Sequence, residues 1–134
     1  MRVTVRALSI ISFIVAMGLM NVRAWAAQAV ALKSGETMEV GNAYWIVNCR
    51  SLLKGHITVE ILDGPPNVTA SIKEQKVIPR AQNCANPVDG GILLVTAPKE
   101  IKERTQAKLI LRLRIPTVDG ERLGSREFDL ILLP

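Results

Sequence analysis

The stretch QAKLILRLRI, residues 106–115, decides the fold class because apolar and charged residues alternate along it. One face carries only apolar side chains: Ala107, Leu109, Leu111, Leu113 and Ile115. The other face carries Lys108, Arg112 and Arg114, with Ile110 as its single apolar residue. A period of two residues predicts a β-strand with one buried and one hydrated face.

The residues that follow predict the partner of this strand. After Pro116, the Asp119-Gly120 pair suits a tight turn that needs a positive φ. The returning stretch REFDLILLP, residues 126–134, alternates again, with Phe128, Leu130 and Leu132 on one face. We therefore expect an antiparallel β-hairpin at the C-terminal end of the chain.

Other short stretches rich in apolar or β-branched residues predict further strands. They are ETMEV (36–40), AYWIVN (43–48), HITVEIL (56–62), VTASIKE (68–74) and GILLVTA (91–97). Two of them alternate, so we expect buried side chains at Ile57, Val59, Ile61, Val68, Ala70 and Ile72. Only APKEIKERT, residues 97–105, predicts a helical turn, with Pro98 at its first position.

About seven short strands separated by turn residues predict an all-β fold, a single immunoglobulin-like β-sandwich. A small β-barrel is the alternative. Uneven connections such as residues 79–90 favour the sandwich, because they suit crossovers between two sheets. Residues 27–134 are enough for one domain with its own core.

The first 26 residues predict a secretory signal peptide. Arg2 and Arg6 precede an uncharged apolar run over residues 7–20, and Ala24-Trp25-Ala26 has the small-residue pattern of a cleavage site. The apolar run is shorter than the roughly 20 residues of a membrane-spanning helix. We expect cleavage after Ala26, a periplasmic or secreted protein, and no membrane span once the leader is removed.

Net charge gives little indication of nucleic-acid binding. The chain carries 17 basic and 12 acidic residues, a net charge of +5. Arg2, Arg6 and Arg23 lie in the predicted leader, which has no acidic residue, so residues 27–134 retain 14 basic and 12 acidic residues, or +2. A basic footprint for nucleic acid is therefore mostly lost with the leader.

Cys49 and Cys84 are the only cysteines in the chain. In an oxidising compartment an even pair predicts a disulfide, here one that would hold the long 79–90 connection. A redox C-x-x-C turn is ruled out by their separation. The single histidine, His56, leaves no clustered ligand set, so we expect no metal and no cofactor.

Two surface features suggest binding. Gly64, Pro65, Pro66 and Asn67 form a proline-stiffened candidate binding loop, preceded by LLKGH at residues 52–56. Stiff loops lose little conformational entropy on binding. The second feature is a candidate basic face of Lys108, Arg112 and Arg114, extended by Arg122 and Arg126, which would suit an acidic partner. Ordinary turns and a solvated strand face are the simpler interpretations of both.

Catalytic signatures are missing from the sequence. There is no G-x-S-x-G turn around Ser51, no phosphate-binding glycine loop and no calcium-loop spacing of carboxylates. An enzyme built around His56, Cys84 or Ser51 stays the least favoured hypothesis, and we expect no enzymatic activity.

Four phrases carry a resemblance: NCRSLLKG (48–55), VEILDGPP (59–66), the second NC before PVDGG (83–91) and the final FDLILLP. Together they resemble small exported proteins of unknown function from Gram-negative soil bacteria. The resemblance implies a single sandwich domain and an exported location, and it implies no site. We expect a structural or binding domain of the cell envelope whose partner is a protein or envelope polymer, or alternatively an inhibitor of an extracytoplasmic hydrolase.

Overall fold

The computed structural model describes residues 27–80 and 83–134; the predicted leader lies outside the described residues. These two ranges contain no α-helix. Their strands are β1 (Gln28–Lys33), β2 (Thr37–Ala43), β3 (Ile46–Val47), β4 (Arg50–Ser51), β5 (Thr58–Asp63), β6 (Thr69–Val77), β7 (Val88–Thr96), β8 (Thr105–Thr117) and β9 (Gly120–Leu133). The all-β fold class predicted from the alternating stretches is confirmed.

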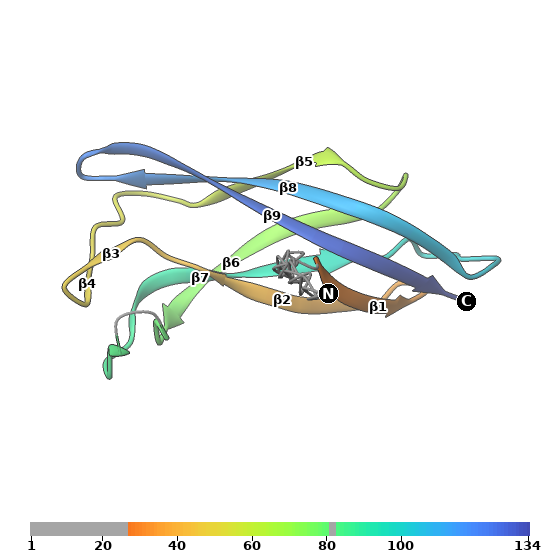
Figure 1. The fold of residues 1–134 in the computed structure, drawn as a ribbon, viewed down its shortest axis with the longest axis horizontal. Coiled ribbons are helices and arrows are strands. Elements are labelled where there is room, and N and C mark those ends of the chain that lie inside the picture. The colour runs from red at the N-terminus through yellow and green to blue at the C-terminus, as the bar shows by residue number, and fades with distance from the viewer. Residues whose placement is uncertain (1–26, 81–82) are drawn as a thin grey trace, which may run out of the picture.

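Seven of the strands form two sheets that face each other, and β3 and β4 form a separate small hairpin (Figure 1). The first sheet has the order β1-β9-β8-β5 and the second the order β2-β7-β6. The order in which the strands follow along the chain distributes them between the sheets as in an immunoglobulin-type sandwich. One sheet holds β2, β6 and β7, and the other holds β5, β8 and β9. The predicted immunoglobulin-like sandwich is therefore the observed architecture, and the barrel alternative is wrong.

The predicted C-terminal hairpin is present and is the longest in the described part of the chain. β8 and β9 pair without interruption from Thr105↔Leu132 to Thr117↔Gly120. Gly120 has a φ of 108°, and the Thr117 hydroxyl accepts from the Asp119 N–H and donates to the Gly120 carbonyl oxygen. A side chain that bonds the turn backbone on both sides, next to a glycine with positive φ, fixes this tight reversal.

The core lies between the two sheets and is built from the faces that alternation predicts. Its fully buried side chains include Leu32, Leu93, Val95, Leu109, Leu111, Leu113 and Leu130. Burying such a leucine contributes about 1.5–3 kcal/mol to stability. The core therefore follows the apolar face of β8, which the sequence assigns, together with those of β7, β9 and β1.

Several element predictions were wrong in detail. Residues 97–105 form no helical turn, because the backbone of this segment bonds to the β1–β2 turn: Ala97 N–H donates to the Glu36 carbonyl (2.9 Å) and Gly35 N–H to the Pro98 carbonyl (2.7 Å). The strand expected at residues 43–48 is only the short β3. Its chain reverses at once through Asn48 and Cys49, which have φ values of 50° and 60°.

Ile61 was expected to be buried and is 38% exposed. The pairing of β5 with β8 shifts between Ile61 and Asp63, so a β-bulge ends the regular alternation there. A further strand, β1, was not predicted at all. It pairs in parallel with β9, from Gln28↔Phe128 to Lys33↔Leu133, and then the chain crosses to the other sheet as β2.

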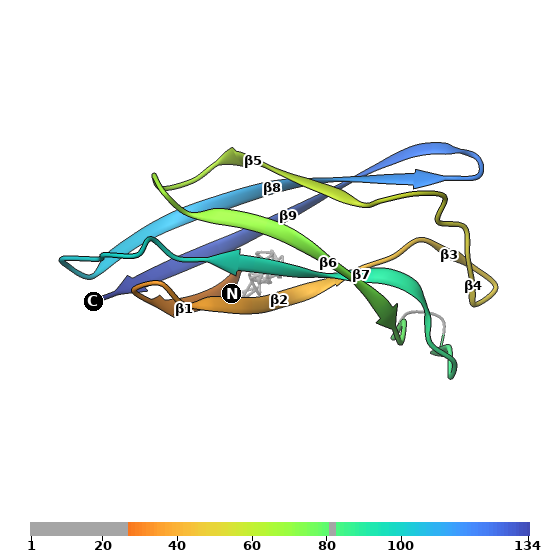
Figure 2. The same ribbon diagram turned by 180° about the vertical axis from the view of Figure 1, so that it is seen from behind.

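The loops gather at two ends (Figures 1 and 2). One end, which we call the disulfide end, holds the β8–β9 turn, the β3–β4 hairpin and the β6–β7 connection. The opposite end holds the β1–β2 turn, the β5–β6 loop and the β7–β8 connection. All candidate sites below lie at these ends or on the outer face of the β1-β9-β8-β5 sheet.

Candidate functional site

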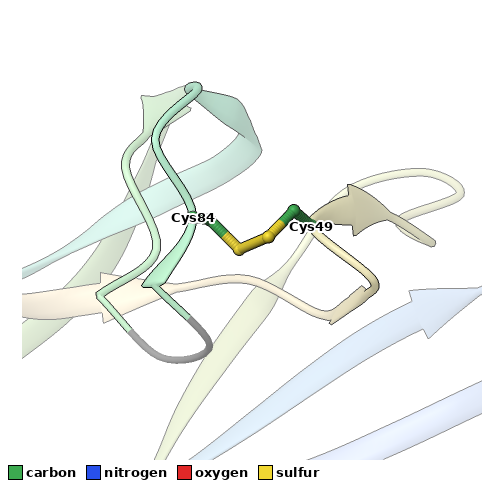
Figure 3. Close-up of a disulfide and its surroundings, with 2 residues drawn as sticks. All are labelled: Cys49 and Cys84. Atoms are coloured by element: carbon green, nitrogen blue, oxygen red, sulfur yellow. A yellow bond between two sulfur atoms is a disulfide. The ribbon is translucent and has the colours of Figure 1, made fainter.

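The predicted disulfide between Cys49 and Cys84 is present (Figure 3). Cys49 lies in the turn between β3 and β4, and Cys84 lies buried in the β6–β7 connection, with a Cα–Cα distance of 5.5 Å. The bond joins these two segments at the disulfide end and does not cross the core between the sheets. With both cysteines in the bond, the protein has no free thiol to act as a nucleophile.

A second, smaller apolar cluster accompanies the disulfide. Val77, Val88 and Ile92 are buried together, and Tyr44, Ile46 and Leu94 pack against them. Ile92 and Leu94 lie on the face of β7 opposite to Leu93 and Val95, which belong to the main core. The β3–β4 hairpin and the adjoining ends of β6 and β7 thus have their own packing outside the main core, and the disulfide ties the hairpin to the β6–β7 connection.

The candidate binding loop lies between β5 and β6 at the end opposite the disulfide. Gly64, Pro66 and Asn67 are exposed, and Pro65 is half-buried. Gly64 packs so closely on the core that a Cβ there would lie 2.7 Å from Leu109 Cδ1. Asn67 has a φ of 64°, a left-handed conformation that asparagine tolerates better than most residues. The loop therefore packs on the core at Gly64 and reverses through a left-handed residue at Asn67.

The loop forms one wall of two neighbouring grooves. A groove of about 600 Å³ runs between Asn67, Thr69 and the segment from Thr96 to Glu100. A second groove of about 320 Å³ lies beside it, and its apolar lining is Pro65, Pro66, Pro98, Ile101 and Leu132. We call residues 64–67 and 97–104, with the two grooves between them, the proline-walled end.

The second wall of the proline-walled end is also fixed. The Ile101 N–H donates to the Ser34 hydroxyl oxygen (3.1 Å), in addition to the bonds of Ala97 and Pro98 to the β1–β2 turn. Lys99, Glu100, Lys102, Glu103 and Arg104 add charges of both signs along this wall. The arrangement offers a preformed apolar surface with a charged rim, which is typical of recognition sites.

The candidate basic face lies on the outer side of the β1-β9-β8-β5 sheet, and each of its three cations has a carboxylate partner. Lys108 contacts Glu127 at 2.7 Å, and this hydrogen bond raises the pKa of Lys108. Arg112 and Arg114 share Glu60 at 3.5 and 3.4 Å, and Arg114 also binds Glu121 at 3.0 Å. The expected extension of this face by Arg122 and Arg126 was wrong, because these residues pair with the inward-facing Ile115 and Leu111; Arg122 instead lies over the Trp45 ring, 5.6 Å from its centroid. The surface is therefore mixed in charge.

A polar cleft at the disulfide end was not predicted. It has a volume of about 400 Å³ and lies between residues 53–57, which lead into β5, and the ends of β6 and β7. His56 contacts Glu74 across it, and Lys76 Nζ contacts Asp89 Oδ1 at 2.8 Å. The hydrogen bond from Glu74 and its negative charge raise the pKa of His56. Ile57 and Leu53 supply the apolar part of the lining.

One feature of the sequence could have indicated these charges: one face of β6 changes from apolar to charged residues along the strand. Ala70 and Ile72 pack against the core, and Glu74 and Lys76 continue the same face of β6. The paired positions on β7 also change from apolar residues to Gly91 and then to the charged Asp89. The inner face of this sheet therefore turns from apolar to charged at the disulfide end, where β5 and β6 diverge (Figure 2).

The cleft does not assemble a recognisable catalytic set in the described part of the chain. The Ser51 hydroxyl donates to the Asp89 carbonyl oxygen at 3.2 Å, and the His56 ring bonds to the Glu74 carboxylate. Among residues 27–80 and 83–134 no group of three or more His, Cys, Asp and Glu side chains is arranged to hold a metal ion. Nucleophilic catalysis needs a nucleophile and a base in hydrogen-bond contact, and Ser51 and His56 do not form such a pair.

In the same ranges, no helix is long and apolar enough to cross a bilayer. Comparisons with known proteins found no family model and no curated protein that matches the chain.

Proposed function

We propose that the protein is an exported, non-catalytic binding domain of the cell envelope that recognises a protein or an envelope polymer through its proline-walled end. The observation that carries the proposal is the preformed pair of grooves at this end. Both walls are fixed before any partner arrives: one by Gly64 on Leu109 and by the two prolines, the other by three hydrogen bonds to the β1–β2 segment. Such preorganisation lowers the entropic cost of binding.

Export is supported by two independent features. The first 26 residues have the composition of a signal peptide, and the remainder carries a disulfide, which persists in oxidising compartments. The candidate basic face contributes little to the proposal, because its cations are already paired. Exposed ion pairs of this kind are worth about 0–1 kcal/mol each, and paired cations attract an anionic polymer weakly.

Site-specific photocrosslinking in the native host tests the proposal. A photoreactive amino acid replaces Asn67 or Lys99, one on each wall of the larger groove, and Ser125 on the outer face of β9 serves as the control. We expect both groove positions to give the same adduct, and the control position to give none. Adducts from Ser125 alone, or none from either groove position at native expression, would contradict the proposal.

An inhibitor of an extracytoplasmic hydrolase is the second candidate. The observation that favours it is the exposed Pro66-Asn67 tip after two consecutive prolines, since a loop stiffened by proline is suited to occupy an enzyme cleft. Assays against a panel of muralytic and proteolytic enzymes separate it from the first candidate. Inhibition that is lost when Pro66 and Asn67 are both replaced by glycine would establish it, and no inhibition at any stoichiometric excess would eliminate it.

A further inference from the structure

The strand β6 has a free edge that is regular along its whole length. Within the described residues its only sheet neighbour is β7, and the two pair without a bulge from Thr69↔Thr96 to Val77↔Val88. The strand contains no proline. A regular edge presents a row of unpaired backbone N–H and C=O groups, to which another strand can add.

The second half of this edge is the accessible half. Near Thr69 the strand runs beside β5, from which it is separated by a short loop, and the two diverge toward the disulfide end (Figures 1 and 2). The polar cleft of about 400 Å³ opens where they diverge, beside Glu74, Gln75 and Lys76. A further strand therefore has room beside residues 73–77.

The charges on this half of the edge are self-complementary. Glu74 and Lys76 lie on one face of β6, on either side of Gln75. If a second copy pairs antiparallel with Gln75 opposite Gln75, each Glu74 lies directly opposite Lys76 of the other copy. A two-fold axis through this point, normal to the sheet, keeps inward faces inward in both copies. Opposite charges at directly paired positions are favourable.

Neighbouring registers lack this match. Centring the pair on Glu74 sets glutamate against glutamate, and centring it on Lys76 sets lysine against lysine, which is unfavourable in a sheet. The Gln75 register has a further consequence at Ile78, the residue after β6, whose side chain is 54% exposed. In this register Ile78 lies opposite Ile72 of the second copy, so an exposed apolar side chain gains an apolar neighbour.

We propose that two copies of this chain pair antiparallel through the free edges of β6 about Gln75, joining two three-stranded sheets into one of six strands. The contacts of Glu74 with His56 and of Lys76 with Asp89 are exposed, with 68% and 70% of the Lys76 and Asp89 side chains accessible. Exposed pairs exchange partners at a small free-energy difference. The pairing is independent of the proline-walled end, which lies at the other end of the sandwich.

The test uses sedimentation equilibrium of the protein as recovered from the periplasm, in oxidised form, over about 1 µM to 1 mM. The native chain is expected to form dimers with rising concentration. Glu74→Lys and Lys76→Glu each set like charges opposite each other twice, which is expected to raise the dimer Kd about tenfold or more. In an equimolar mixture of the two variants, position 74 of each chain lies opposite a residue of opposite charge at position 76 of the other. The mixture is therefore expected to form heterodimers in the same concentration range in which the native chain forms dimers.

The mixture shows whether a variant fails to dimerise because of its charge or because it is unfolded. Each variant keeps its substitution in the mixture, so an unfolded variant would still not associate specifically there. Lys73→Glu is the matched control: Lys73 lies on the other face of β6, opposite Val77 in the paired register, and its change is expected to leave the dimer Kd unchanged. A native chain that stays monomeric throughout, a Glu74→Lys variant that dimerises as well as the native chain, or a mixture that stays monomeric would each overturn the proposal.

Discussion

At the scale of single residues, Gly90 is the position most constrained by its neighbours. A Cβ at this residue would lie 2.5 Å from the Ala43 carbonyl oxygen and 3.0 Å from Val77 Cγ2. The backbone oxygen belongs to the paired strand β2 and cannot move without disturbing the β2–β7 ladder. Only a residue without a side chain allows the β2 backbone to approach this closely, next to the second apolar cluster.

Gly90→Ala is therefore expected to lower the free energy of unfolding by about 1–3 kcal/mol, as overpacking does elsewhere. Gly41→Ala is the matched control, because no atom lies within 4 Å of the Cβ position at Gly41. Alanine there should leave stability unchanged or raise it slightly, since glycine costs about 0.5–1 kcal/mol in a strand. Urea unfolding of both variants measures the difference, and equal effects would contradict the close approach at Gly90.

His56 provides a pH dependence whose sign is fixed by its partner. Glu74 raises the pKa of His56 in the folded protein, so the folded chain holds this proton more tightly than the unfolded chain. The stabilisation is fully present below the ordinary histidine pKa of about 6.5 and is lost as the pH rises through the folded-state value. Lys76 and Asp89 also face this cleft, and their opposite charges largely offset each other.

Because His56 is the only histidine, NMR titration of its ring reports a single curve. We expect a midpoint above the ordinary value in the native chain and a return toward that value in Glu74→Gln. Glu39→Gln provides a control for net charge, since it makes the same change of charge on β2, outside the lining of the cleft. A midpoint that is the same in the native chain and in Glu74→Gln would contradict the His56–Glu74 contact.

Alternation predicted most core residues correctly and failed where pairing became irregular. Leu109, Leu111 and Leu113 were expected to be buried, and their side chains are fully buried. Ile61 follows the same rule in the sequence and is nonetheless 38% exposed, because the β-bulge next to it depends on how β5 meets β8. A bulge is a property of two strands, so the pattern within one strand does not predict it.

At the scale of elements, the disulfide has a calculable effect on stability. It closes a loop of 35 residues, for which the chain-entropy model gives about 3.8 kcal/mol. We expect the free energy of unfolding of the double variant Cys49→Ser/Cys84→Ser to be about 2–5 kcal/mol lower than that of the native chain. The loss should appear first at the disulfide end, because the main core and the β8–β9 hairpin do not depend on this bond.

Hydrogen exchange followed by residue separates these regions. In the double serine variant, amides of β3, β4 and the described part of the β6–β7 connection should exchange faster, while those in the middle of β8 and β9 stay protected up to global unfolding. Uniform acceleration over all strands would show that the bond supports the whole sandwich. No change at β3 and β4 would show that the second apolar cluster holds the disulfide end without it.

Elements with strong local patterns were predictable, and those fixed by distant contacts were not. The β8–β9 hairpin has alternation on both strands and a turn of the right type between them, and it was predicted correctly. The strand β1 has only two buried side chains, Val30 and Leu32, and its parallel partner lies about one hundred residues further along the chain. The segment 97–104 is irregular because the β1–β2 turn binds its backbone, and the helix propensity of its residues does not include such contacts.

At the scale of the whole molecule, the sequence predicts sites within one loop better than sites shared among segments. Gly64, Pro65, Pro66 and Asn67 are contiguous, and the structure gives them a second wall at residues 97–104. The polar cleft draws on three separate segments, so the sequence shows its residues only as isolated charges. The cations of the candidate basic face were visible, but which carboxylate each one contacts depends on strand register.

The proposed function requires that the protein is exported and loses its leader, with the Cys49–Cys84 bond closed at the disulfide end. The intact mass of the protein recovered from the periplasm, measured before and after reduction and thiol alkylation, tests it most directly. We predict a chain that begins at Ala27, two hydrogens lighter than its reduced form, with no alkylation until it is reduced. A mass that includes residues 1–26, or two thiols that react without reduction, would contradict the account.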